Sequence, residues 1–291
     1  MDYQWYPGHM TRAKRQMQED IRLVDLVIEL TDARAPLSGR NPDIDSLAAG
    51  KSRILLLNKS DLADPAENKA WVAHFRQNGL FACEIDSRAG SGIRQIRPMI
   101  AEACREKIER DRKRGIVNRP LRAMIAGIPN VGKSTFINSF AKKSAAKTGN
   151  KPGVTRGRQW ITVDRTLQLL DTPGILWPRF DDRMVGIRLA ELGSIRDEIL
   201  TTEELAAGMI GWMREAYPTV LESRFRISQE GSPQDVLGRI AEARKCLKAG
   251  SEPDTEKAAA LLLDDFRSGK LGRMTLEKAP SVRDPLTQQD P

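Results

Sequence analysis

Apolar and polar positions follow two different periodicities along the chain, and the change between them separates two regions. Up to about residue 172, short apolar runs rich in branched side chains alternate with longer segments of helical pattern. Short runs of this kind are typical of buried strands. We expect strands at residues 23–30, 53–58, 81–86, 121–128, 158–163 and 167–172, of which the last two form a hairpin.

Helical patterns lie between these runs, over residues 11–22, 65–78 and 92–115, and again from about Ser134. Strands that alternate with helices predict an α/β domain, with a mostly parallel sheet and helices on both faces. Residues 105–119 carry seven Lys and Arg against three Asp and Glu, so the third helix is expected to run into a basic connector.

Beyond about residue 185 the strand signal fades, and a small all-α domain is expected to follow. Helical patterns cover residues 202–218, 232–250 and 254–270. The second has Ser232 at the N-cap, Pro233 at the first helical position and Asp235 three after the cap, and it is expected to end at Gly250. The polar tail, 279–291, is expected to be disordered.

Charge and cysteine content indicate the kind of partner and the compartment to expect. The chain has 291 residues, a formal net charge of +8 and three cysteines. A surplus of Lys and Arg favours a polyanionic partner, although a basic enzyme without such a partner has the same composition. Sparse, scattered cysteines indicate reduced thiols in a cytoplasmic protein. There is no secretory signal at the start and no apolar run long enough to span a membrane.

A phosphate-binding loop follows the strand at 121–128. Residues 127–135, GIPNVGKST, contain the complete pattern GxxxxGK[ST]. Gly127 and Gly132 let backbone N–H groups turn toward the phosphates, Lys133 adds a positive charge, and the Ser134 hydroxyl suits Mg²⁺. The same loop contributes three further residues expected to contact the nucleotide, namely Asn130, Val131 and Thr135.

Two later segments complete the phosphate side of the site. Thr155 lies in a Gly- and Pro-containing loop, where a GTPase needs a threonine for Mg²⁺ and the γ-phosphate. Asp171-Thr172-Pro173-Gly174 follows a strand, as the DxxG element does. Asp171 is expected to support the Mg²⁺ shell, and the Gly174 N–H to meet the γ-phosphate. Taken singly, each segment also fits an ordinary loop or turn.

The base-reading element precedes the phosphate loop. Residues 58–61, Asn58-Lys59-Ser60-Asp61, have the form NKxD. Asp61 can accept hydrogen bonds from the ring N–H and exocyclic amine of guanine, donors that adenine lacks, so an ATPase is disfavoured. Lys59 can lie on the base, and Asn58 can tie this segment to the phosphate loop.

A second base loop follows the third strand, where Asp86, Ser87 and Arg88 occupy the positions of a SAK-like element. The match is loose, and the backbone N–H of Ser87 is expected to reach the guanine oxygen. GTPases usually carry these elements in the order phosphate loop, Thr, DxxG, NKxD, SAK. This chain has all of them in a single cyclic shift, which predicts a circularly permuted GTPase domain.

At this point the chain resembles the circularly permuted GTPases, and most closely the ribosome biogenesis GTPase A group. The resemblance rests on WYPGHM (5–10), DARAP (32–36), NKSD, GIPNVGKST, PGVTRG (152–157), DTPGILWP (171–178) and LGRMTLE (271–277). It implies a Mg²⁺-dependent GTPase that binds GTP and GDP and assists late maturation of the large ribosomal subunit, in bacteria or mitochondria. The helical domain is then expected to contact ribosomal RNA.

The expected division is a GTPase domain at 1–180, a switch-linked connector at 181–200, a helical RNA-binding domain at 201–278 and the tail at 279–291. We expect a monomer, with the RNA and proteins of the large subunit as partners. Ile175, Leu176 and Trp177 favour a connector that transmits switch ordering to the helical domain, although a plain linker is the alternative. The basic run at 142–158, together with Arg12, Lys14 and Arg15, is either a solvated face or an RNA contact.

The group that places the attacking water is left open. Ile175 occupies the position where Ras-like GTPases have a glutamine, and it cannot orient water. One candidate is His9, which follows Pro7-Gly8; the other is a monovalent cation, K⁺, held by Asn130. Each residue can also be purely structural. The runner-up function is a nucleotide-gated RNA-binding module whose GTP hydrolysis is incidental.

Overall fold

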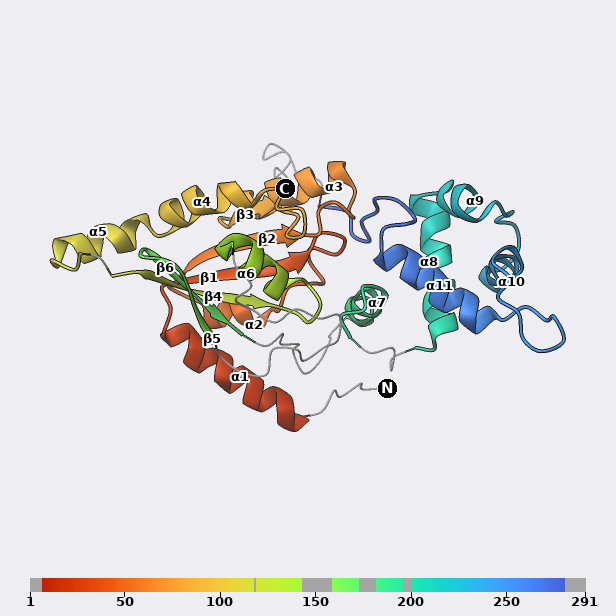
Figure 1. The fold of residues 1–291 in the computed structure, drawn as a ribbon, viewed down its shortest axis with the longest axis horizontal. Coiled ribbons are helices and arrows are strands. Elements are labelled where there is room, and N and C mark those ends of the chain that lie inside the picture. The colour runs from red at the N-terminus through yellow and green to blue at the C-terminus, as the bar shows by residue number, and fades with distance from the viewer. Residues whose placement is uncertain (1–6, 118, 143–158, 173–181, 196–199, 281–291) are drawn as a thin grey trace, which may run out of the picture. The chain divides into compact units, whose positions relative to one another are not determined.

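The computed structural model describes residues 7–117, 119–142, 159–172, 182–195 and 200–280, with side chains from residue 15 onward. These residues form two compact units (Figure 1). One comprises residues 8–172 together with 275–280, and the other comprises residues 182–274. The expected fold, a mostly parallel α/β domain and an all-α domain, is confirmed.

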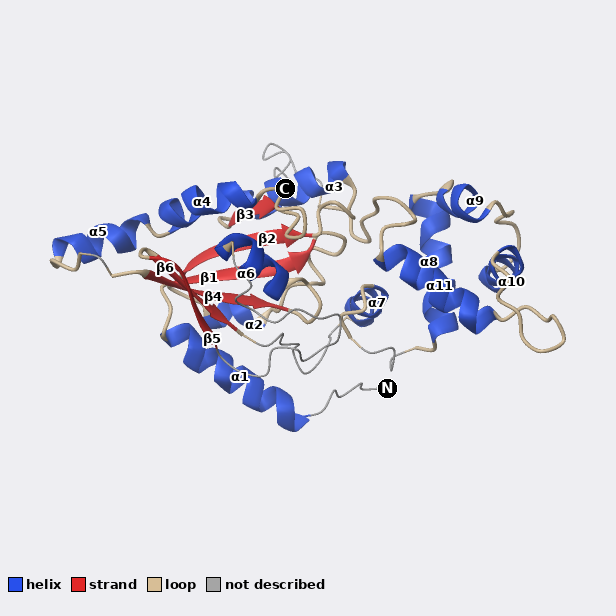
Figure 2. Ribbon diagram, viewed as in Figure 1, coloured by secondary structure: helices blue, strands red, loops and turns tan. Residues whose placement is uncertain are grey.

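The α/β unit contains one sheet of six strands in the order β3-β2-β1-β4-β6-β5 (Figure 2). All neighbours are parallel except β5 and β6, which form the expected antiparallel pair. The strands are β1 (Leu26–Asp32), β2 (Ser52–Asn58), β3 (Phe81–Glu84), β4 (Leu121–Gly127), β5 (Gln159–Asp164) and β6 (Leu167–Asp171).

Helices cover both faces of this sheet (Figure 1). They are α1 (Pro7–Arg22), α2 (Asp43–Leu47), α3 (Pro65–Gln77), α4 (Ile96–Ala103), α5 (Arg105–Lys113) and α6 (Lys133–Ala141), with a single 3₁₀ turn at Ile93–Gln95. Helix α1 buries Met17 and Ile21 against Val27 of β1 and Met124 of β4. The ring of Trp71 in α3 packs on β2 and β3. The polar helix α5 buries none of its residues.

The helical unit contains α7 (Arg183–Glu191), α8 (Thr202–Ala216), α9 (Val220–Phe225), α10 (Pro233–Ala243) and α11 (Thr255–Arg267). Helices α8, α10 and α11 pack on one another, and each buries an apolar stripe. The predicted capping box of α10 is present, since the hydroxyl of Ser232 accepts from the Asp235 N–H and the Asp235 carboxylate accepts from the Ser232 N–H. No helix in the described ranges is both long and apolar enough to cross a membrane.

Some boundaries differ from those expected. Helix α10 ends at Ala243 and not at Gly250, because Lys245 adopts a left-handed conformation (φ 55°) and the Cys246 N–H closes the end on the Ala241 carbonyl. The connector expected at 181–200 contains α7, which packs on α8. Residues 275–280 return to the α/β unit, although 201–278 was expected to form the helical domain.

Candidate nucleotide-binding site

The loops that carry the predicted motifs meet at one edge of the sheet. Because β1, β2, β3, β4 and β6 are parallel, the segments that follow them emerge at the same edge. The chain builds outward from β1 to β2 and β3, and then starts again on the other side of β1 with β4. Ligands of open α/β sheets bind at such a switch point, at the carboxyl ends of the strands.

The phosphate loop joins β4 to α6, and its backbone needs glycine at both ends. Gly127 has φ 149°, and a Cβ there would lie 2.5 Å from the Leu30 carbonyl oxygen. Gly132 has φ 98°, and its Cβ would lie 2.5 Å from Asn58 Nδ2. The loop therefore approaches β1 and the NKSD segment more closely than any side chain permits. The N-terminus of α6 follows directly at Lys133, a position suited to phosphate.

Lys133 is buried and turned back onto this loop. Its Nζ donates to the carbonyl oxygens of Gly127 and Ile128, both at 2.9 Å. Burial lowers the pKa of Lys133 to about 8, although the charge of Asp171 opposes this effect. A buried cation is costly unless negative charge compensates it, so anionic oxygens of a nucleotide in the loop would stabilise Lys133.

Asn58 joins three of the predicted loops. Its Nδ2 donates to the Val131 carbonyl oxygen at 2.7 Å, which gives the expected link to the phosphate loop. Its Oδ1 accepts from the Ser87 N–H at 3.1 Å and from the Ser87 hydroxyl at 2.7 Å. That the Ser87 N–H meets the guanine oxygen stays a prediction; in this structure the donor is engaged by Asn58.

Comparisons with known proteins agree with this geometry. The profile of the 50S ribosome-binding GTPases matches residues 122–217, which begin at β4 and do not include the NKSD segment. Ribosome biogenesis GTPase A of Bacillus cereus is 46% identical over 95% of this chain and 94% of its own length. The chain belongs to the ribosome biogenesis GTPase A family.

More distant relatives cover the chain equally well. Ribosome biogenesis GTPase A of Thermotoga maritima is 32% identical over 98% of this chain and 97% of its own length. Mitochondrial ribosome-associated GTPase 1 of Bos taurus is 32% identical over 94% of this chain and 88% of its own. The GDP-bound structure of TM YlqF superposes with a TM-score of 0.69 and 27% identity, over 91% of this chain and 99% of that one.

The protein is thus a GTPase, which binds GTP and GDP and hydrolyses GTP. The segment that is predicted to read the base, NKSD, begins at the end of β2, in a conformation held by backbone and side-chain hydrogen bonds. Lys59 has φ 60°, the Ser60 N–H donates to the Ile85 carbonyl at 3.1 Å, and the Ser60 carbonyl accepts from Asn68 Nδ2 at 3.1 Å. Asp61 is exposed and accessible to a base.

The GTPase has a buried ion pair that the motif search missed. Asp32, the last residue of β1, lies beside Asn58 in the sheet register. Its Oδ2 is 2.9 Å from Lys59 Nζ. Arg34 donates from Nε to Asp32 Oδ1 and from Nη2 to Asp32 Oδ2, each at 2.9 Å. Burial would raise the pKa of Asp32, but Arg34 and Lys59 outweigh it and hold the pKa far below the usual range. In the sequence, Asp32 follows an apolar run at the start of a Pro- and Gly-containing segment, so it resembles an ordinary loop residue.

The residues expected to hold Mg²⁺ fit that ion as far as the structure describes them. Asp171 ends β6 and pairs in register with Ile125 of β4, and Ser134 lies in the first turn of α6. A carboxylate and a hydroxyl are oxygen ligands of the kind Mg²⁺ prefers. The GTPase family to which the chain belongs implies this ion. When bound, Mg²⁺ would neutralise charge on the β- and γ-phosphates. Thr155 and Gly174 lie outside the described residues.

The remaining predicted residues are placed as follows. Asp86 accepts from the N–H groups of Arg88 (2.8 Å) and Ala89 (3.0 Å), and so shapes its own loop. Asn130, the K⁺ candidate, has φ 60° in the phosphate loop and is half-buried. His9 lies in the first turn of α1, and its side chain is outside the described set. Ile175 and the basic run beyond Lys142, at 143–158, also lie outside it.

Proposed function

We propose that this GTPase acts as an assembly factor in late maturation of the large ribosomal subunit, and that it binds ribosomal RNA when GTP orders its switch segments. The observation that carries the proposal is the path of the chain. Asp171 ends β6 at the nucleotide site, and the next described element is α7 of the helical unit. Ordering at the γ-phosphate therefore leads directly into the helical unit, as the permuted order requires.

The relatives support the ribosomal part of this proposal. The names of the matched proteins refer to ribosome biogenesis or to association with the mitochondrial ribosome. The net charge of +8 favours a polyanion, which in an assembling ribosomal subunit is RNA. The protein would act wherever such subunits are assembled.

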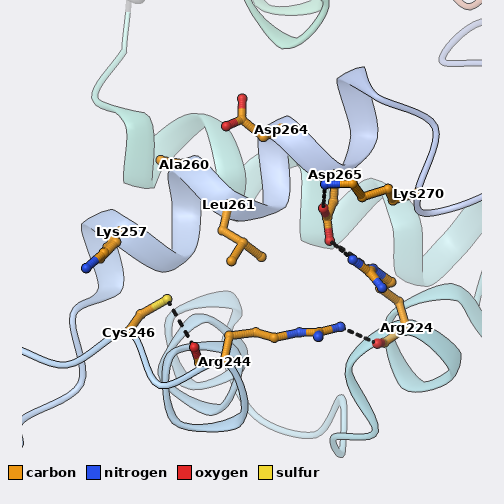
Figure 3. A pocket seen from close by; sticks show the side chains of 9 residues that line it. All are labelled: Arg224, Arg244, Cys246, Lys257, Ala260, Leu261, Asp264, Asp265 and Lys270. Atoms are coloured by element: carbon orange, nitrogen blue, oxygen red, sulfur yellow. Dashed lines mark hydrogen bonds and ion pairs between the residues drawn. The ribbon is translucent and has the colours of Figure 1, made fainter.

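The helical unit offers a basic pocket for this contact (Figure 3). It has a volume of about 460 Å³ and is lined by Arg224, Arg244, Lys257 and Lys270, against Asp264 and Asp265. Arg224 binds Asp265 at 2.8 Å, and Lys270 lies 3.4 Å from it, so this carboxylate holds two of the cations in place.

Arg244 is held differently in this pocket. It donates to the Arg224 carbonyl at 2.8 Å, and its guanidinium lies 5.1 Å from the centre of the Phe225 ring. A guanidinium supported by an aromatic face retains further donors for phosphate. We propose that Arg244 and Lys257 contact RNA phosphates.

A turnover assay tests the main proposal. GTP hydrolysis is measured with and without large ribosomal subunits, and we expect strong stimulation by immature or mature subunits. The runner-up, an RNA-binding module with incidental hydrolysis, is favoured by Ile175 and predicts GTP-dependent binding to the subunit with no stimulation. If the subunits neither bind nor stimulate, the ribosomal role is wrong.

Charge reversal tests the basic pocket. The Arg244→Glu and Lys257→Glu double variant should bind the subunit more weakly and with a smaller salt dependence, while GTP affinity stays unchanged. The Lys245→Glu and Lys248→Glu double variant is the matched control, because it reverses the same number of charges at exposed residues of the same region that do not line the pocket. Equal losses in both variants would show that only overall charge matters. Crosslinking to subunit RNA would then locate the true contact.

A further inference from the structure

Residues 275–279 form a returning segment that binds the α/β unit on both sides of the base-reading element. On one side, the hydroxyl of Thr275 accepts from the Asp64 N–H at 3.0 Å, and the Glu277 carbonyl accepts from Trp71 Nε1 at 2.9 Å. Asp64 caps α3, the helix that begins just after NKSD. On the other side, the Leu276 N–H donates to the Arg34 carbonyl at 2.7 Å.

The side chain of Glu277 is the main anchor of this segment. Its carboxylate accepts from the N–H groups of Leu37 (2.7 Å) and Ser38 (3.0 Å) and from the Ser38 hydroxyl. Glu277 is only 4% exposed and Ser38 only 3%. A carboxylate buried to this degree is stable only when donors surround it, so the loop at 33–38 and Glu277 are built for each other.

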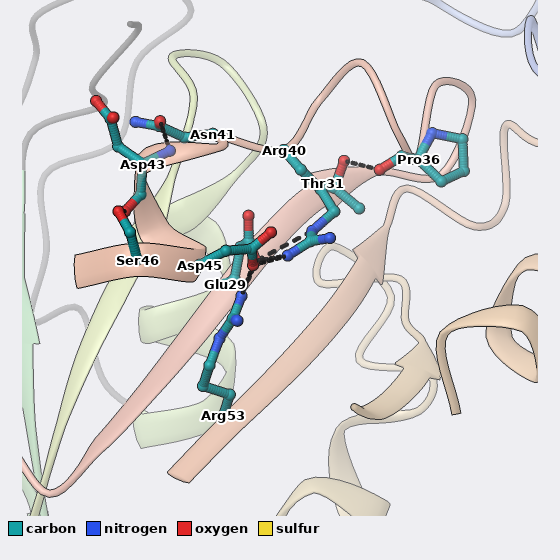
Figure 4. Close-up of polar contacts among 9 residues, drawn as sticks. All are labelled: Glu29, Thr31, Pro36, Arg40, Asn41, Asp43, Asp45, Ser46 and Arg53. Atoms are coloured by element: carbon teal, nitrogen blue, oxygen red, sulfur yellow. Dashed lines mark hydrogen bonds and ion pairs between the residues drawn. The ribbon is translucent and has the colours of Figure 1, made fainter. Parts of the chain in front are cut away.

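Contacts of the residues that flank the loop at 33–38 hold it in place as well. The Thr31 hydroxyl donates to the Pro36 carbonyl at 3.1 Å, and Arg40 binds Glu29 at 3.1 Å. Figure 4 shows both contacts. Arg40 also binds Asp45 at 2.7 Å. The loop is therefore a rigid support, with the Asp32–Arg34 ion pair at its start.

The Asp32 carboxylate connects the loop at 33–38 to Lys59. Strand β1 lies between β2, which leads into NKSD, and β4, which leads into the phosphate loop, so Asp32 lies between the two. Its carboxylate holds the Lys59 ammonium, while Lys59 remains 26% exposed. A lysine tethered at its end presents its alkyl stem in one conformation, which saves the entropy of ordering it when a base arrives.

We propose that Asp32 and Glu277 are positioning residues for guanine nucleotide binding: Glu277 fixes the 33–38 loop, the loop fixes Asp32 through Arg34, and Asp32 holds Lys59 against the base. The proposal rests on the assignment of residues 58–61 as the base-reading element. It also means that the helical unit is joined to the nucleotide site twice, because residues 275–279 continue directly from its last residue, Met274.

Nucleotide affinity and turnover test the proposal in the full-length protein. Asp32→Asn and Glu277→Gln should each raise the KM for GTP and the GDP dissociation rate about tenfold, with kcat at saturating GTP nearly unchanged. Affinity for tripolyphosphate, which has no base, should stay the same. Glu67→Gln is the matched control, because Glu67 accepts from the Ala279 N–H at the far end of the segment and should change neither value.

A double-mutant cycle separates positioning from a loss of stability. In a Lys59→Met background, which keeps the stem and removes the charge, Asp32→Asn should cause no further loss of GTP affinity. Full, additive losses would overturn the proposal, as would equal losses of GTP and tripolyphosphate affinity. If Asp32→Asn does not fold, because Arg34 is left unpaired, Glu277→Gln decides on the same readouts.

Asp61→Asn distinguishes this proposal from the assignment beneath it. If Asp61→Asn leaves GTP affinity unchanged, the base-reading assignment itself fails, and the positioning role fails with it. If Asp61→Asn weakens GTP while Asp32→Asn and Glu277→Gln do not, only the positioning role is wrong.

Discussion

At the scale of single residues, the nucleotide site is built from side chains whose partners are mostly other loops of the site. Asn58 connects the phosphate loop to the loop at 86–92, and Asp32 connects β1 to Lys59. Asp61, in contrast, is exposed. Asn58 and Asp32 therefore hold the loops around Asp61, the carboxylate that is predicted to select the base.

Asp61→Asn should convert the base preference of the GTPase. An asparagine offers a donor where guanine also has donors, so GTP affinity should fall on the order of 10²-fold or more. Xanthosine triphosphate carries an acceptor at that position and should bind better to the variant than to the native protein. Competition binding with both nucleotides measures the change. Unaltered thermal unfolding is expected, because Asp61 is exposed, and an unaltered GTP affinity would contradict the assignment.

Lys133→Ala and Ser134→Ala should each abolish Mg²⁺-GTP binding or turnover, because neutralising phosphate charge and placing the metal dominate phosphoryl transfer. Lys69→Ala, a change on the exposed side of α3, is the control. Normal turnover in both loop variants would remove the phosphate-loop assignment.

The pKa of Lys133 makes a separate prediction for the native protein. Burial places this pKa at about 8 in the nucleotide-free state, and bound phosphates should raise it. Nucleotide binding above about pH 8 should then take up a proton, and affinity should fall as the pH rises further. Calorimetry in buffers of different ionisation enthalpy measures the uptake. Proton release on binding would contradict the prediction that bound phosphates raise the pKa of Lys133.

At the scale of elements, the sequence pattern was sufficient wherever apolar periodicity was strong. Strands β2, β4 and β6 and helices α3 and α8 begin and end within a few residues of the expected positions. Short elements such as α2 and α9 carry too few periodic positions to be recognised. The end of α10 was missed because a left-handed Lys245, and not the glycine, terminates it.

In the candidate site too, some parts could be predicted from the sequence and others could not. Motifs with fixed spacing, NKSD and GIPNVGKST, placed their loops correctly because backbone geometry dictates their residues. The Glu277 contacts were not predictable, since they join residues about 240 positions apart. The Asp32–Lys59 contact was not predictable either, since it joins the ends of two different strands. Long-range hydrogen bonds between loops leave no periodic trace in a single sequence.

Helix α7 should make the stability of the helical unit depend on pH. Glu191 ends this helix and is 5% exposed, and burial raises its pKa to about 8 from 4.5, despite the charges of Arg188 and Arg267. The folded state then binds a proton that the unfolded state has released, so this stabilisation is complete below about pH 4.5 and is lost as the pH rises through about 8.

Glu191→Gln mimics the protonated carboxyl and should remove this dependence. Relative to the variant, the native protein should lose on the order of 4 kcal/mol of unfolding free energy between about pH 5 and pH 9. Urea unfolding at several pH values, with exposed Glu242→Gln as control, measures the difference. Parallel pH profiles for the native protein and Glu191→Gln would show that Glu191 is ionised throughout.

At the scale of the whole molecule, the permutation determines what the helical unit can sense. In chain order this unit begins after the segment that follows Asp171 and ends where residues 275–279 return to the base-reading side. It is thus inserted between the phosphate end and the base end of one nucleotide site. A partner that binds the helical unit has covalent routes to both ends, as the proposed stimulation of hydrolysis by ribosomal subunits requires.

The attacking water must be placed by a group other than a glutamine, because Ile175 occupies that position. His9 is the candidate on the chain: it lies in the first turn of α1, after Pro7-Gly8 and just before Arg12, Lys14 and Arg15. Binding of these basic residues to RNA would order this turn on the particle, so GTP hydrolysis by the free protein should be slow.

Groups that orient water or transfer its proton contribute about 10²–10⁴-fold to the rate. His9→Ala should therefore keep GTP affinity and lose most of the stimulation by large ribosomal subunits, while basal turnover changes less. His74→Ala, in α3, should lose none of the stimulation. If His9→Ala keeps full stimulation, Asn130 and a bound K⁺ become the leading explanation, and replacing K⁺ by Na⁺ in the same assay should then abolish it.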